Sequence, residues 1–140
     1  MLINFWRQLF SSHTISFDPT SPVIEIPVRL QNGKHELFTS FVLDTGATYT
    51  VIDDGLVKFL ELKPSKKSIE LTTASGTEQA GLVTIPKISV AGLTQEDSLA
   101  IVTQLPDDAG ITGLLGLSFL KQYRFTVDYP KKVIRFSEID

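Results

Sequence analysis

Short runs of alternating or β-branched residues, each closed by turn residues, recur along the sequence and constrain its fold more than any other feature. Residues 23–30 alternate, and Gln31-Asn32-Gly33-Lys34 is a strong hairpin signal before a second run at 35–43. Strands that recur every eight to twelve residues or so are typical of a barrel or a sandwich. The pattern therefore predicts an all-β domain.

A second hairpin is predicted in the middle of the chain. Residues 68–73 and 77–84 carry β-branched side chains, and they flank the small, polar tip Ala74-Ser75-Gly76, where the glycine allows a positive φ. Further strands are predicted at residues 87–90, 99–102, 124–128 and 133–137, the last two joined by a turn at 129–132.

Helix is scarce in this sequence. One short helix is expected at residues 53–60, with Asp53 or Asp54 as its N-cap. The other is expected at residues 118–123, with Ser118 as the cap after Gly116. We find no repeat and no low-complexity linker, so these helices belong to the same domain as the strands.

The composition sets limits on function. A chain of 140 residues with 42% hydrophobic content suits one domain, which we place at residues 21–140 after an arm at 1–20. The net charge of −3, without a basic stripe, argues against nucleic-acid binding. Because the chain has no cysteine, disulfides and thiolate metal sites are excluded.

The first ten residues are apolar but too short to span a bilayer. They lack the basic region and cleavage site of a signal peptide, so we expect a cytoplasmic protein. The apolar positions of residues 1–10 fall at helical spacing, which fits three arrangements. An arm folded onto its own domain is favoured, and contact with a membrane surface or with a partner chain stays open.

One carboxylate stands at the end of an apolar run. In Phe41-Val42-Leu43-Asp44-Thr45-Gly46-Ala47-Thr48, the strand delivers Asp44 to a turn, where Gly46 permits close backbone approach and Thr45 can hydrogen-bond to a neighbour. This arrangement suits a catalytic acid held by a rigid scaffold. For the tripeptide alone an ordinary turn after a strand is the favoured interpretation, because three residues are a weak motif, so its context decides.

That context lies about seventy residues further on, in Ile111-Thr112-Gly113-Leu114-Leu115-Gly116. With Asp44-Thr45-Gly46 before it and a hairpin at residues 72–78 between the two, the chain resembles the retropepsin-like aspartic proteases, in their cellular and bacterial branch. The resemblance implies a pepsin-like half-barrel with a flap hairpin and one or two short helices. It covers residues 23–136.

The resemblance also implies a mechanism. Two carboxylates share one proton: one activates a water, and the other hydrogen-bonds the scissile carbonyl. The implied catalytic residues are Asp44, Thr45 and Gly46, and no cofactor is needed. Since Asp108-Ala109-Gly110 lacks the hydroxyl of a second motif, we expect a homodimer that cleaves peptide bonds best at mildly acidic pH.

A peptide or protein substrate would lie in a cleft between the motif and the flap. The substrate-binding positions inferred in this way are Ala47, Thr48, Tyr49, Ala74, Ser75, Gly76, Thr77, Ile111 and Leu114.

The chain departs from the retroviral members at two positions. Where many of those enzymes pair an acidic residue with an arginine across the dimer, this sequence has Thr48 and Leu117. Both charges are missing together, which leaves no unpaired charge. The dimer geometry of the viral enzymes therefore cannot be copied, and we place the interface at the hairpin of residues 124–137, on the outward positions of 133–136.

Three rival interpretations were weighed. The chief alternative is a catalytically silent, dimeric peptide-binding module with the same fold. A metal site is disfavoured because His13 and His35 are far apart, and both are expected on the surface or in hydrogen bonds. A Ser-His-Asp triad has little support because there is no Gly-x-Ser-x-Gly elbow.

Overall fold

The first long hairpin follows directly from the local sequence. In this computed structural model, which describes residues 13–139, Asn32 and His35 pair across the two-residue turn Gly33-Lys34. The elements run in the order β1 (Thr14–Ser16), β2 (Glu25–Asn32), β3 (His35–Leu43), β4 (Thr50–Asp53), α2 (Asp54–Phe59), β5 (Pro64–Thr73), β6 (Gly76–Val90), β7 (Leu93–Thr103), the 3₁₀ helix η1 (Asp107–Ala109), β8 (Gly113–Leu115), α3 (Leu117–Leu120), β9 (Tyr123–Asp128) and β10 (Val133–Glu138).

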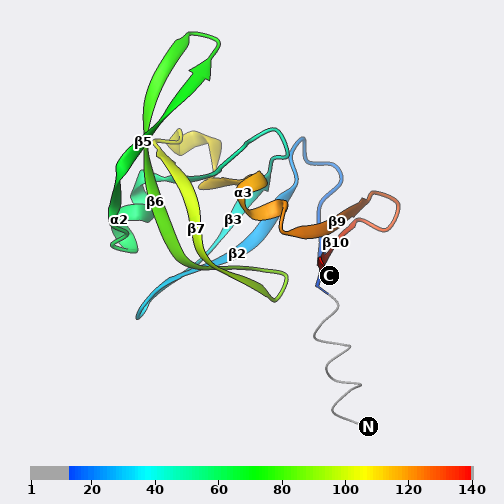
Figure 1. Ribbon diagram of the computed structural model, residues 1–140. Coiled ribbons are helices and arrows are strands. Elements are labelled where there is room, and N and C mark those ends of the chain that lie inside the picture. Colours follow the sequence, from blue (N-terminus) through cyan, green and yellow to red (C-terminus); the bar gives the residue numbers. More distant parts are fainter. Residues whose placement is uncertain (1–12, 140) are drawn as a thin grey trace.

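Six of the strands close into a ring. The larger sheet has the order β2-β3-β8-β4-β7-β6-β5, and β2 also pairs with β6, with Leu30 opposite Ile88. Strand β5 lies outside the ring and forms a hairpin with β6 that projects from the body, drawn in green in Figure 1. Fully buried side chains such as Phe41, Ile52 and Leu115 form the core. The predicted all-β half-barrel with a flap hairpin is confirmed.

The smaller sheet has the order β1-β10-β9 and is antiparallel. Ile134 and Phe136 on β10 are buried in the main core, while Arg135 between them is exposed. The expected outward positions of residues 133–136 are therefore Val133 and Arg135. Strand β9 pairs only with β10 in the part of the chain that the structure describes, so one edge of β9 carries no strand.

The two short helices differ in how well the sequence predicts them. Asp53 caps α2, and its Oδ2 accepts a hydrogen bond from the Gly55 N–H at 3.0 Å. The expectation for residues 118–123 is wrong: α3 ends at Leu120 and its N-cap is Gly116, without a side-chain cap. Ser118 lies inside the helix, and tertiary partners take its hydroxyl group.

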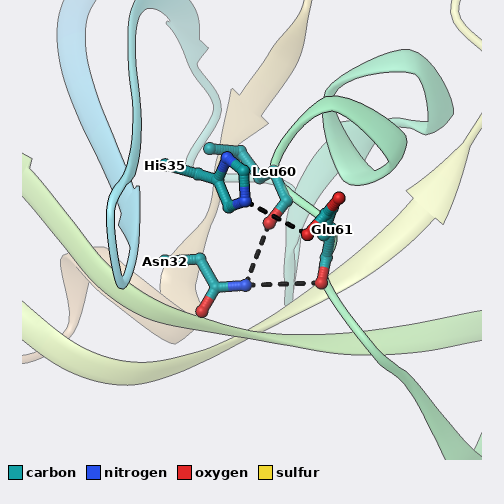
Figure 2. Close-up of polar contacts among 4 residues, drawn as sticks. All are labelled: Asn32, His35, Leu60 and Glu61. Carbon is teal, nitrogen blue, oxygen red and sulfur yellow. Dashed lines mark hydrogen bonds and ion pairs between the residues drawn. The ribbon is translucent and has the colours of Figure 1, made fainter.

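A small polar cluster ties the β2–β3 hairpin to the end of α2 (Figure 2). The Asn32 amide donates to the backbone carbonyls of Leu60 and Glu61, at 2.9 and 3.3 Å. In the same cluster, His35 Nε2 lies 3.1 Å from the Glu61 carboxylate. The other histidine lies outside this cluster, with His13 Nδ1 at 2.8 Å from the Ala91 carbonyl. Both histidines are hydrogen-bonded, as predicted.

No helix between residues 13 and 139 has the length and apolar character that crossing a membrane requires. The predicted contacts of residues 1–10 lie outside the described residues.

Candidate active site

Asp44 stands at the end of β3, where backbone hydrogen bonds fix its position. Leu43 lies beside Leu115 in the parallel β3–β8 pair, and the Asp44 N–H donates to the Leu115 carbonyl at 3.1 Å. Asp44 Oδ1 accepts the Gly46 N–H at 2.9 Å. The carboxylate is half-buried, whereas Thr45 and Gly46 are exposed. A rigid turn therefore presents an acid at the surface.

The turn after Asp44 rests on the segment that follows β8. The Leu117 N–H donates to the Ala47 carbonyl at 2.8 Å, and the Ser118 N–H donates to the Thr48 carbonyl at 2.9 Å. Strand β8 lies between β3 and β4, with Leu114 opposite Val42 on one side and Val51 on the other. The two motifs that the sequence analysis connected are thus joined by direct hydrogen bonds.

The glycines of the second motif are required by this close approach. A Cβ on Gly116 would lie 2.5 Å from the Tyr49 carbonyl oxygen and 2.8 Å from that of Ala47. A Cβ on Gly113 would lie 2.6 Å from the Val51 carbonyl oxygen. Real Cβ contacts are not this short, so only glycine lets the two backbones meet.

A buried hydroxyl pair supports the same turn from behind. Thr50 is fully buried, and its Oγ1 accepts the Gly116 N–H at 3.2 Å. Ser118 Oγ accepts the Thr50 N–H at 2.9 Å and lies 3.2 Å from the Leu99 carbonyl, to which it donates. Thr50 is not among the site residues predicted from the sequence. The sequence feature that could have indicated it is a threonine directly before the apolar pair Val51-Ile52. A threonine buried with such a pair needs a hydrogen-bond partner for its hydroxyl group.

A second apolar cluster lies next to the turn. It is separate from the main core and consists of Ala80, Leu82 and Ile101, with Tyr49, Val51, Ile69 and Leu71 packed against it. Tyr49 and Val51 come directly after the Asp44 turn, and Ile69 and Leu71 belong to the projecting hairpin. This cluster therefore connects the hairpin to the neighbourhood of Asp44.

The remaining predicted residues occupy three places. Thr48 is exposed and Ala47 and Tyr49 are half-buried, all within the Asp44 turn, while Leu114 is half-buried in β8. The expected tip, Ala74 to Thr77, is exposed at the end of the β5–β6 hairpin, and Gly76 has a φ of +126°. Ile111 lines a cavity with Asp53 and Leu105.

A cavity of about 540 Å³ lies away from Asp44, between α2 and residues 104–107. It is lined by Asp53 and by the Asp54–Lys58 ion pair, among others. Asp53 is already engaged there, since its Oδ1 accepts the Leu105 N–H at 2.9 Å. Over residues 13–139 we find no group of three or more His, Cys, Asp or Glu side chains that could hold a metal.

Comparisons with known proteins agree with this geometry. A sequence model of a family described as aspartyl protease matches residues 26–119, which include both motifs. The fold is similar to the crystal structure of a retropepsin-like aspartic protease from Rickettsia conorii, with a TM-score of 0.61 and 21% identity over 87% of this chain and 95% of that one. No curated protein sequence gives a significant match.

Proposed function

The chain belongs to the aspartyl protease family, and from that premise we propose that it is an endopeptidase active as a homodimer. Asp44 supports the proposal most directly, because it is a half-buried carboxylate held in a fixed turn by main-chain hydrogen bonds. Peptide hydrolysis by shared carboxylates needs two such groups. A second copy of the chain supplies the other one.

The proposed reaction uses one proton between the two aspartates. The ionised carboxylate takes a proton from a water molecule as the water oxygen attacks the scissile carbonyl carbon. The protonated carboxyl donates a hydrogen bond to the carbonyl oxygen, on which negative charge develops. The proton then passes to the amide nitrogen, the carbon–nitrogen bond breaks, and the two peptide products leave.

The exposed Thr45 and Gly46 stand where a second copy would approach. We assign the Thr45 hydroxyl to a hydrogen bond with the partner's backbone, which would lock the two turns together. Ala47, Thr48, Tyr49, Ile111 and Leu114 are assigned to the substrate cleft, and Ala74 to Thr77 to the lid over it. An extended peptide would bind there through main-chain hydrogen bonds.

The open edge of β9 is the proposed dimer contact. An unpaired strand edge offers a row of backbone donors and acceptors, and antiparallel pairing with a second β9 would satisfy both rows. Val133 and Arg135, the outward positions of β10, would flank the contact. This location keeps the interface in the C-terminal hairpin.

The deciding experiment compares the wild type with Asp44→Asn on a randomised peptide library between pH 4 and 7, with sedimentation of both. Cleavage by the wild-type dimer alone supports the proposal, since asparagine cannot serve as the base. Two dimers that both fail to cleave would favour a peptide-binding module instead. Equal cleavage by the two proteins would exclude Asp44 as the catalyst.

A further inference from the structure

The two faces of the projecting hairpin differ in chemistry. We call residues 68–81 the flap hairpin. Its register is regular, with Ile69 opposite Ala80 and Leu71 opposite Glu78. Residues directly opposite each other in an antiparallel pair point to the same side. Glu78 therefore shares a face with three apolar residues of the hairpin.

That face is turned towards the neighbourhood of Asp44. Ile69 and Leu71 are half-buried and pack with Ala80, in the cluster that also receives Tyr49 and Val51. Because Tyr49 and Val51 follow the Asp44 turn, this side of the flap hairpin is the side over the cleft. Glu78 is exposed on it, directly opposite Leu71 and closer to the tip than Ile69 and Ala80.

The opposite face is polar along its whole length. Glu70 lies opposite Gln79, and Thr72 lies opposite Thr77. Ser68 Oγ donates to the Gln79 side-chain oxygen at 2.8 Å on this outer face. The flap hairpin therefore carries one carboxylate on each side: Glu70 faces away from the cleft and Glu78 faces towards it.

Glu78 takes part in no ion pair with another residue between 13 and 139. The ion pairs found among residues 13–139 join Arg29 to Glu36, His35 to Glu61, Lys58 to Asp54 and Arg135 to Asp128. None of them includes Glu78. Water solvates a carboxylate poorly on the side that faces an apolar surface. The attraction between such a carboxylate and a cation is therefore stronger than it would be in open water.

We propose that Glu78 binds a cationic substrate side chain, lysine or arginine, beneath the flap hairpin. The inference rests on the proposed function and names the substrate class of that site. Arginine suits the position best, because its planar guanidinium can donate two hydrogen bonds to one carboxylate. In a homodimer the two copies of Glu78 lie on either side of the scissile bond, so the preference extends to equivalent positions on both sides.

The test is a peptide series that differs at one position. Each residue within four positions of the cleaved bond is set to arginine, lysine, glutamine or glutamate, and kcat/KM is measured for each peptide. We expect the best position to favour arginine over glutamine by about fivefold, as for an ion pair open to solvent, and to lose this preference at high salt. The inference is wrong if kcat/KM shows no preference for arginine or lysine at any of the positions tested.

Matched variants assign the effect to Glu78. Glu78→Gln should abolish the preference for arginine, measured within the variant as the ratio of kcat/KM for the arginine peptide to kcat/KM for the glutamine peptide. Glu70→Gln removes the same charge from the outer face of the same hairpin and should keep the full preference. Loss of the preference in Glu70→Gln to the same degree would mean that net charge, not the cleft face, is responsible, which contradicts the proposal.

A binding measurement separates this inference from the proposed activity. Fluorescence anisotropy of labelled arginine and glutamine peptides is recorded with Asp44→Asn and with Asp44→Asn combined with Glu78→Gln. Tighter binding of the arginine peptide only when Glu78 is present upholds the inference, even if no variant cleaves. Equal binding by both proteins rejects it, even if the wild type is an active peptidase.

Discussion

Ser118 Oγ accepts the backbone N–H of Thr50 at 2.9 Å, and this one contact joins the helix after the second motif to the strand after the first. The same hydroxyl reaches the Leu99 carbonyl on β7. Three segments that are distant in sequence thus meet at one oxygen atom. The turn that carries Asp44 is held by the same helix, because the Leu117 and Ser118 N–H groups donate to the carbonyls of Ala47 and Thr48.

Removing that hydroxyl should destabilise the fold. Ser118→Ala leaves the Thr50 N–H without its acceptor, and we expect a loss of about 1–3 kcal/mol in the free energy of unfolding. Urea unfolding followed by circular dichroism measures the change. Ser137→Ala, at an exposed position on β10, is the control and should stay within about 0.5 kcal/mol of the wild type. Equal effects of the two changes would refute this role of Ser118.

Gly116 should not tolerate a side chain. In Gly116→Ala the new methyl group would meet the Tyr49 carbonyl, so the turn must move, at a cost of about 2–3 kcal/mol. Gly81→Ala is the matched control, because a Cβ there has no atom within 4 Å. Thermal unfolding of both variants is the measurement, and peptide cleavage should fall in Gly116→Ala alone. A stable, active Gly116→Ala protein would contradict the close approach.

Alkaline pH should destabilise the protein partly through Tyr123. Partial burial raises the pKa of its hydroxyl, the neighbouring Gln95 side chain lowers it by a smaller amount, and the nearby charge of Glu138 raises it. The folded state therefore holds this proton more tightly than the unfolded chain, whose tyrosines titrate near about pH 10. The contribution of this proton to the free energy of unfolding is complete below that pH. It is lost as the pH rises through the pKa that Tyr123 has in the folded state.

The corresponding experiment measures the free energy of unfolding from pH 8 to 11. Stability of the wild type should fall more steeply above pH 10 than that of Tyr123→Phe, which cannot ionise there. Tyr129→Phe keeps the ring contact with Phe17 and should follow the wild type. If the free energy of unfolding falls with pH equally steeply in the wild type and in Tyr123→Phe, the burial of Tyr123 does not make stability depend on pH.

Like charges on the proposed interface should weaken the dimer. Thr126 is exposed on β9, and Thr126→Glu would place two glutamates close together across a twofold axis. We expect the dimer dissociation constant to rise about tenfold or more, as sedimentation velocity would measure. Thr94→Glu, exposed on β7 of the other sheet, is the control and should not change assembly. A dimer that withstands Thr126→Glu would move the contact away from β9.

The sequence predicted best what short-range interactions determine. The strand at residues 35–43 agrees with β3, because Gly33-Lys34 sets the turn and the alternation sets the faces. Asp53 caps α2 as expected, because the cap needs only the Gly55 N–H two residues away. The position of Asp44 at the end of a strand is likewise determined by its near neighbours in the sequence.

The errors occurred where distant segments decide the structure. Strand β4 has four residues and was not predicted, because its partners β7 and β8 lie far along the chain. Ser118 was expected to cap a helix, but Thr50 and Leu99 take its hydroxyl. The separate strands expected at residues 77–84 and 87–90 are one strand, because β6 continues through Pro86 in pairing with β7.

The insertion of β8 between β3 and β4 also sets the order in which the protein can mature. Asp44 emerges early in synthesis, but the residues that hold its turn, Leu115 to Ser118, follow some seventy positions later. A nascent chain that ends before them has a carboxylate on a turn without its support. The turn that carries Asp44 thus stays without its hydrogen-bond partners until most of the domain has been made.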